Sequence, residues 1–288
     1  MLHETIHLSE SYPGATLTTY VSYDPPELKK TPRKAIVVCP GGGYHFLSDR
    51  EGEPIVKEFL AAGLNVFLLR YTVGMKTEQS PGATEYAPLI EAALSIKHIR
   101  ENHEKYNIDP DQVFIIGFSA GGHLAASAGI LWNADPVQKA LGASAENPTT
   151  IGKPNGMILS YPVISSGPYA HKNSFYHLCN TKTPTEEELN RFSLELHVDE
   201  TSTPAFVWHT FPDTTVPVQN SLLLANAFTK AGVPFEMHIY PDGVHGLSLS
   251  TKETWSQNPK TFVPHADSWM PLAIRWVKDF GNFGPQTV

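Results

Sequence analysis

A serine between closely spaced glycines is the first group in this sequence that could act as a nucleophile. Gly117-Phe-Ser119-Ala-Gly121 follows an apolar run at 113–116 and precedes a segment typical of a helix at 120–131. A sharp turn between a buried strand and a helix lifts its central side chain above a sheet, and small neighbours avoid clashes there. The amino end of a helix also favours developing negative charge. We therefore expect Ser119 to be a nucleophile rather than an idle serine in a glycine-rich turn.

A serine hydroxyl needs a general base, and His245 is the best placed of the 13 histidines. It follows the last predicted strand, so it should lie at the carboxyl edge of a sheet, beside Ser119. Asp213 also follows a predicted strand and should reach the same edge, where a carboxylate could orient the imidazole. Asp242 is the rival acid, but its Pro-Asp-Gly setting is typical of a turn.

Four other histidines are interpreted as structural. His123 lies in the helix after Ser119 and should pack locally, and His209 lies within a predicted strand and should belong to the core. His171 and His177 lie in a long irregular segment. Loop residues are the favoured interpretation for these two, with contact to a substrate as the alternative.

Three consecutive glycines supply candidate donors for a developing oxyanion. Pro40-Gly-Gly-Gly-Tyr44 follows an apolar strand predicted at 34–39. Acyl transfer places negative charge on the former carbonyl oxygen, which backbone N–H groups can stabilise. We expect the donors to be Gly42, Gly43 and Ala120. A phosphate loop is excluded because no Gly-Lys-Ser/Thr follows and Gly-x-Gly-x-x-Gly is not matched.

The order of the predicted elements indicates one α/β domain over 1–288 with an antiparallel start at 1–24. The segment 23–32 is predicted to be a turn or exposed loop. Strands are predicted at 34–39, 65–71, 112–116, 156–161, 205–210 and 234–240, and helices at 51–62, 84–104, 120–131, 217–231 and 270–280. Short apolar strands separated by helices are typical of a mostly parallel sheet with helices on both faces.

One long stretch, 163–203, breaks this alternation. It is rich in Pro, Ser, His and Asn and is too long for a simple connection, so we predict a cap or binding-loop insertion at the carboxyl edge of the sheet. Its aromatic and histidine content fits a substrate wall and a subunit interface equally well; these residues are Tyr169, His171, Phe175, Tyr176 and His177.

Composition excludes several classes of protein. With 41% hydrophobic and 17% charged residues the chain can bury a large core, and its net charge of −8 argues against a nucleic-acid binder. The apolar runs are far shorter than the roughly twenty residues of a membrane span. Two cysteines, Cys39 and Cys179, make no disulfide framework, and no His/Cys spacing indicates a metal. No cofactor is implied, and the amino-terminal sequence lacks a secretory pattern, so we expect a cytoplasmic location.

With these elements in order, residues 30–280 resemble the α/β-hydrolase superfamily. The Pro-Gly-Gly-Gly-Tyr, Gly-Phe-Ser-Ala-Gly-Gly-His-Leu-Ala and Trp-His-Thr-Phe-Pro-Asp strings are similar to those of bacterial lipase/esterase proteins of the acetylxylan-esterase-like and feruloyl-esterase-like group, some of which are labelled sugar hydrolases. The resemblance implies a triad of Ser119, Asp213 and His245, in the superfamily's chain order. Many related esterases carry histidine where Pro40 stands here, so any hydrogen bond from that histidine must come from another residue.

The resemblance implies a serine carboxylesterase for short-acyl esters, with acetylated sugars as candidate substrates and a small-molecule ester as the partner. Tyr44, His171 and Tyr176 are candidate substrate contacts. A serine peptidase of the prolyl-oligopeptidase type is the runner-up, although the roughly 115 residues before Ser119 leave no room for its usual extra domain. A catalytically silent hydrolase fold used for binding is the other alternative, and a homo-oligomer stays open.

Overall fold

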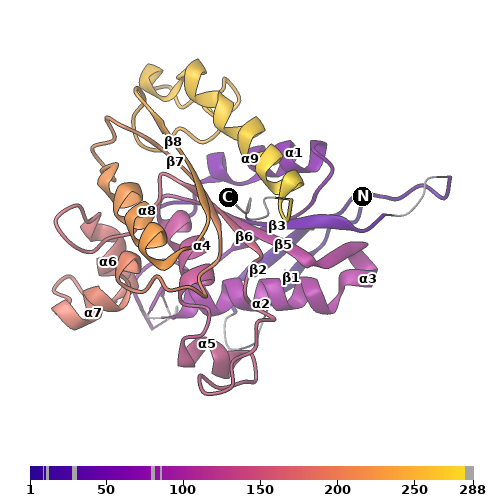
Figure 1. Cartoon of the computed structure of the whole chain (residues 1–288), viewed down its shortest axis with the longest axis horizontal. Helices are drawn as coiled ribbons and strands as arrows, with labels where there is room; N and C mark the ends of the chain where they lie inside the picture. The colour runs from indigo at the N-terminus through magenta and orange to yellow at the C-terminus, as the bar shows by residue number, and fades with distance from the viewer. Residues whose placement is uncertain (9, 11–12, 28–30, 79–81, 85, 283–288) are drawn as a thin grey trace.

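The architecture is a twisted sheet between two layers of helices (Figure 1). The computed structural model describes residues 1–8, 10, 13–27, 31–78, 82–84 and 86–282. In that part of the chain the strands are β1 Thr5–His7, β2 Thr16–Tyr20, β3 Arg33–Cys39, β4 Asn65–Arg70, β5 Ile108–Phe118, β6 Gly156–Ser160, β7 Ala205–Thr210 and β8 Phe235–Tyr240. They form one sheet in the order β1-β2-β4-β3-β5-β6-β7-β8. The pairs β1–β2 and β2–β4 are antiparallel and the others are parallel, which confirms the predicted antiparallel start and mostly parallel sheet.

Helices cover both faces of the sheet, as predicted. The described helices are α1 Glu53–Ala61, α2 Ala87–Glu101, α3 His103–Tyr106, α4 Ala120–Ile130, α5 Asp135–Ala140, α6 Lys172–Leu178, α7 Glu186–Arg191, α8 Gln219–Ala231 and α9 Trp269–Asp279. Figure 1 shows α1 and α9 on one side of the sheet and α2, α4 and α8 on the other. Because side chains alternate along a strand, Val37 packs with the α2–α4–α8 layer and Val38 with the α1–α9 layer. The five fully buried residues that end β3 therefore read as an uninterrupted apolar run.

The helix expected at 84–104 is shorter and is interrupted. It begins at Ala87 with Pro88 in its first turn, which suits proline because the first helical N–H groups lack intrahelical partners. It ends at Glu101 with Asn102 as its C-cap, and the single turn α3 follows before Asn107 takes a left-handed conformation. Residue 85 of this expected helix, and residues 28–30 of the expected loop at 23–32, lie outside the described residues.

The 163–203 insertion and the segment before it contain helices that hydrophobic periodicity did not predict. The helices α5 and α7 have six residues each, which is too short for a periodic pattern to stand out. A capping box begins α7, in which Thr185 accepts a hydrogen bond from the amide of Glu188 and the Glu188 carboxylate bonds back to Thr185. This Thr-x-x-Glu spacing is the sequence signal that could have located α7.

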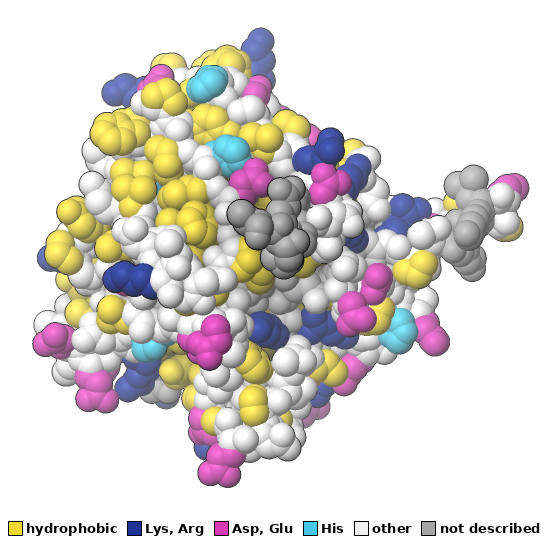
Figure 2. Space-filling view, viewed as in Figure 1, with side chains coloured by type: hydrophobic (Ala, Val, Ile, Leu, Met, Phe, Trp, Pro, Cys, Tyr) yellow, Lys and Arg dark blue, Asp and Glu magenta, His cyan; other side chains and the backbone are white. Residues whose placement is uncertain are grey.

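The far edge of the sheet is formed by β8, which pairs only with β7 among the described strands. Its Phe235 and Ile239 side chains are partly exposed, and Phe211 beside it is well exposed. Figure 2 shows apolar side chains gathered on this side of the molecule. This edge therefore presents a partly apolar surface to solvent. No helix within the described ranges is long and apolar enough to cross a membrane.

Candidate active site

The turn between β5 and α4 holds Ser119 in an uncommon backbone conformation, with φ of 54° and ψ of −116°. Three backbone hydrogen bonds fix it: the Ser119 amide donates to Ser160, and its carbonyl accepts from the amides of His123 and Val163. Gly121 permits the turn, because a Cβ atom there would lie 2.2 Å from the carbonyl oxygen of Cys39. The missing side chain lets the first turn of α4 rest on the end of β3, which carries the glycine-rich loop.

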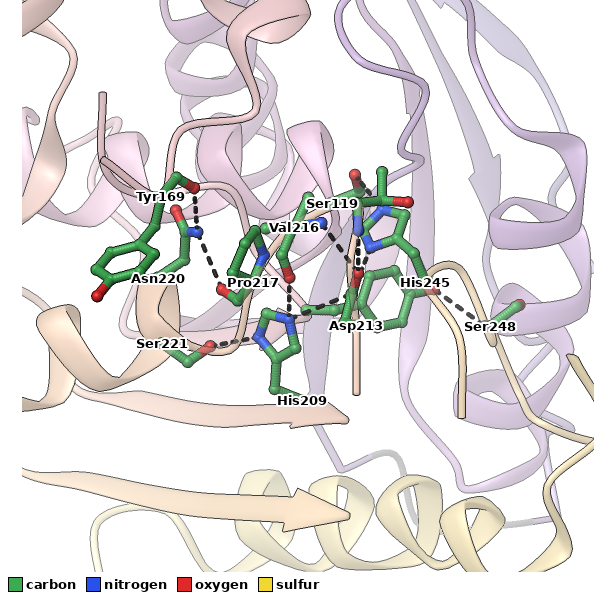
Figure 3. Close-up of polar contacts among 12 residues, drawn as sticks. Ser119, Tyr169, His209, Asp213, Val216, Pro217, Asn220, Ser221, His245 and Ser248 are labelled. Carbon is green, nitrogen blue, oxygen red and sulfur yellow. Dashed lines mark hydrogen bonds and ion pairs between the residues drawn. The ribbon is translucent and has the colours of Figure 1, made fainter. Parts of the chain in front are cut away.

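Ser119, His245 and Asp213 form one hydrogen-bonded chain (Figure 3). The Nε2 atom of His245 lies 2.8 Å from Ser119 Oγ, and its Nδ1 atom lies 2.6 Å from Asp213 Oδ2. Because the carboxylate can only accept, Nδ1 carries the proton and Nε2 is free to accept the serine proton. The three residues singled out in the sequence are thus brought together with the polarity that a serine nucleophile requires. Asp242, the rival acid, is exposed and accepts a hydrogen bond from the amide of Gly243.

The Asp213 carboxylate is fully buried and bonded through both oxygens. Its Oδ1 accepts from the amides of Thr215 and Val216, each at 2.9 Å. Burial alone would raise the pKa of Asp213, but hydrogen bonds from His209 and His245 outweigh it and hold that pKa well below its usual range. The carboxylate therefore stays charged at neutral pH.

The glycine-rich loop borders the same cavity as Ser119. Gly42 has a φ of 131°, and its carbonyl accepts from the amides of His45 and Phe46, so the loop turns tightly over itself. A Cβ atom at Gly42 would lie 2.0 Å from the carbonyl oxygen of Phe46. No described residue accepts a hydrogen bond from the amides of Gly42, Gly43 or Ala120. These N–H groups are available to a ligand oxygen, with Gly42 and Gly43 lining the cavity and Ala120 buried at the start of α4.

Two tyrosines support the glycine-rich loop that begins at Pro40. Tyr71 donates its hydroxyl to the carbonyl of Pro40 at 2.6 Å. Tyr44, expected to touch substrate, is only 1% exposed, and its hydroxyl bonds to His123 Nδ1 at 2.8 Å. The other nitrogen of His123 donates to the carbonyl of Phe192 in the insertion at 2.8 Å. The side chain of Tyr44 therefore anchors the loop rather than facing the cavity, and His123 reaches much farther than the local packing expected for it.

Glu51 is a buried acid that sequence reasoning did not single out. Its Oε2 accepts from the amide of Gly41 at 2.9 Å, and its Oε1 accepts from the hydroxyl of Tyr161 at 2.6 Å. The Tyr161 oxygen accepts in turn from the amide of Ser248, three residues after His245. Glu51 thus joins the glycine-rich loop to the loop that carries His245. Its position at the start of a predicted helix gave no signal of this role.

We expect Glu51→Gln to disturb both loops together. Gly41 and Tyr161 both donate to the carboxylate, so the amide nitrogen of glutamine would face a donor and leave a buried group unpaired. The expected loss is about 10–10²-fold in kcat, because small displacements of reacting groups are costly. Turnover of p-nitrophenyl acetate measures it, with Glu53→Gln as the matched surface control. An unchanged kcat would contradict this role for Glu51.

The cavity above Ser119 has a volume of about 370 Å³. Its described lining is Gly42, Gly43, His45, Phe46, Ser48, Arg50, Glu51, Ser119, His171, Asn173, His177, Thr215, His245 and Gly246. The insertion thus supplies part of the wall through His171, Asn173 and His177, whereas Tyr176 is not among the lining residues. Burial, together with the nearby His245, lowers the pKa of His171. Sequence reasoning missed Asn173, Arg50 and Thr215 because single polar residues outside a motif carry no distinguishing pattern.

The chain matches a known protein family and is similar to proteins named as enzymes. The family model described as BD-FAE matches residues 23–228. A protein named endo-1,4-beta-xylanase B from Butyrivibrio fibrisolvens is 40% identical over 224 residues, which cover 78% of this chain and 34% of that protein. An acetylxylan esterase from Xylanibacter ruminicola is 28% identical over 242 residues, which cover 82% of this chain and 45% of that protein. The chain therefore spans less than half the length of these curated relatives.

A solved structure matches almost the whole chain. It is the acetyl ester-xyloside bifunctional hydrolase from Caldicellulosiruptor lactoaceticus, which is 32% identical with a TM-score of 0.78. The match covers 98% of this chain and 97% of that one. The shared architecture therefore includes the strands that carry Ser119, Asp213 and His245.

Proposed function

The chain belongs to the BD-FAE family, and from this premise we propose that it is a carboxylic ester hydrolase that cleaves short-acyl esters through Ser119, His245 and Asp213. The observation that carries the proposal is the chain of hydrogen bonds from Ser119 Oγ through His245 to Asp213. At its Ser119 end, this chain of hydrogen bonds reaches a cavity bordered by glycine amides that have no partner among the described residues.

In the proposed reaction, Ser119 Oγ attacks the ester carbonyl while its proton passes to His245 Nε2. Asp213 holds the imidazole in place and stabilises its positive charge. The amides of Gly42, Gly43 and Ala120 bind the oxyanion. The carbon–oxygen bond of the ester then breaks, and His245 returns the proton to the departing alcohol. Water attacks the acyl-enzyme with His245 again as the base, which releases the acid and restores Ser119.

The residues that line the cavity favour an ester with a short acyl group and a polar alcohol. Among the described residues that line it, Phe46 carries the one hydrophobic side chain. The cavity of about 370 Å³ must hold both halves of the ester, which favours a short acyl group. The histidines and Asn173 can hydrogen-bond to hydroxyl groups, and two of the proteins compared above are named acetylxylan esterase and acetyl ester-xyloside bifunctional hydrolase. Acetylated sugars are therefore the proposed substrate class.

Hydrolysis of p-nitrophenyl acetate, butyrate and octanoate tests the proposal, with Ser119→Ala as the blank. We expect kcat/KM for acetate to exceed that for octanoate by about tenfold or more, because the longer acyl chain exceeds the room in the cavity. Faster cleavage of octanoate would refute the short-acyl preference. If a phosphonate labels Ser119 but no ester is cleaved, the prolyl-oligopeptidase-type alternative gains; if no labelling occurs, the silent binding module does.

Three further expectations accompany this function as proposals. The partner is a small-molecule ester rather than a nucleic acid or a membrane. The location is cytoplasmic, an expectation with which the two unpaired cysteines, Cys39 and Cys179, agree. Self-association stays a prediction, for which the open edge at β8 is the surface to examine.

A further inference from the structure

A second histidine lies against the acid of the proposed triad. His209 is on β7 and is fully buried, and its Nε2 atom lies 3.3 Å from Asp213 Oδ2. The same Oδ2 accepts the hydrogen bond from His245 (Figure 3). The carboxylate oxygen that faces the proposed base is therefore shared between two imidazoles.

The neighbours of His209 determine which of its nitrogens carries a proton. Nε2 also lies 2.8 Å from the carbonyl oxygen of Val216, which can only accept. Nδ1 lies 2.8 Å from the hydroxyl of Ser221, which can donate. Nε2 is thus the protonated nitrogen, and its hydrogen is divided between Val216 and Asp213. The array runs from Ser221 through His209, Asp213 and His245 to Ser119.

This array leaves the Asp213 carboxylate little freedom. Backbone amides of Thr215 and Val216 hold Oδ1, and the imidazoles of His209 and His245 hold Oδ2. Without the His209 donor, Oδ2 of the buried carboxylate would have His245 as its sole partner among the described residues. The carboxylate could then rotate, and the hydrogen bond that orients His245 would lose its fixed direction.

We propose that His209 is a positioning residue for the ester hydrolysis, acting through Asp213 by donating its Nε2–H to the oxygen that also faces His245. The inference rests on the proposed function. His209 is not among the described residues that line the cavity, and its hydrogen bonds go to Ser221 and Val216 rather than to Ser119, so its effect should reach the reaction through the acid. If His209 merely filled the core, replacing it would affect folding, and its effect on turnover would not depend on the presence of Asp213.

Two amide substitutions at His209 test whether its Nε2–H is the group that acts on Asp213. In His209→Gln the amide nitrogen reaches about as far as Nε2, whereas in His209→Asn it reaches only about as far as Nδ1, on the side of Ser221. We expect kcat for p-nitrophenyl acetate to fall about 10–10²-fold in the Asn variant with KM little changed, and to stay within about threefold of wild type in the Gln variant. Unchanged kcat in the Asn variant, or equal losses in both, would overturn the proposal.

A double-mutant cycle separates action through Asp213 from a general structural role. In an Asp213→Ala background, His209→Asn should cost no more than about twofold, because the residue through which it acts is gone. An equal loss in both backgrounds would show that His209 serves only the Val216 carbonyl. Thermal denaturation of each variant checks that it is folded.

A measurement on the unmutated protein stands in if the variants do not fold. The imidazole N–H resonances of wild type are recorded by NMR before and after a phosphonate has modified Ser119. The Nε2 proton of His209 is expected to move, because it shares Oδ2 with His245; a static resonance would refute the coupling. Loss of all Ser119-dependent turnover would defeat the proposed function, whereas Ser119-dependent turnover that ignores His209 defeats this inference alone.

Discussion

Ser119→Ala is expected to lower kcat for p-nitrophenyl acetate by about 10⁴–10⁶-fold, the scale seen when a serine nucleophile is removed. The serine oxygen is the group 2.8 Å from His245 Nε2, and among the described residues no other hydroxyl hydrogen-bonds to that nitrogen. Residual turnover should reflect only substrate binding and the oxyanion donors. Steady-state hydrolysis and labelling by a fluorescent phosphonate measure the loss independently.

Ser144→Ala is the matched control for this variant, because Ser144 is exposed and bonds only locally, to the amide of Asn147. It should retain wild-type turnover and full labelling. If Ser119→Ala kept substantial activity while remaining folded, the nucleophile would be another group and the proposed mechanism would be wrong.

Asp213→Asn is expected to cost about 10³–10⁴-fold in kcat through the wrong tautomer of histidine. Because Oδ1 accepts two backbone amides, the asparagine oxygen must stay there and its NH₂ group must take the place of Oδ2. That NH₂ would donate toward His245 Nδ1 and force the imidazole proton onto Nε2. His245 would then present a proton to Ser119 Oγ instead of accepting one.

The rival acid provides the control for this second variant. Asp242→Asn alters an exposed carboxylate three residues before His245 and should leave kcat within about twofold, as surface changes away from a site usually do. Parallel kcat measurements on the two variants decide which acid is used. A larger loss in Asp242→Asn than in Asp213→Asn would reverse the assignment.

The sheet was predictable because its central strands are buried on both faces. Such strands appear as short apolar runs, and β7 was predicted with the bounds that the structure has. Ser119, Asp213 and His245 could be inferred to converge because each follows a strand, and the carboxyl ends of parallel strands meet at one edge of the sheet. Local sequence patterns were therefore enough to predict both the order of the elements and the convergence of the three residues.

The supporting contacts could not be predicted, because they join residues far apart in the chain. Glu51 and Tyr161 are 110 residues apart, and His123 and Phe192 are 69 apart. Neither pair has a spacing that a one-dimensional pattern can reveal. Tyr44 illustrates the same limit: its place after the glycines suggested substrate contact, but burial against His123 directs its side chain elsewhere. His209 was correctly expected to be buried, yet the position of its polar partners was not visible.

The backbone conformation of Ser119 has a consequence for directed evolution. A positive φ at a residue with a side chain typically costs about 1–3 kcal/mol of folding free energy, and glycine relieves most of that cost. A library screened for heat resistance alone would therefore tend to enrich glycine at 119, and with it an inactive protein. Screens for thermostable variants of this chain must couple survival to turnover at every round, because the most reactive position is also one where the native residue opposes stability.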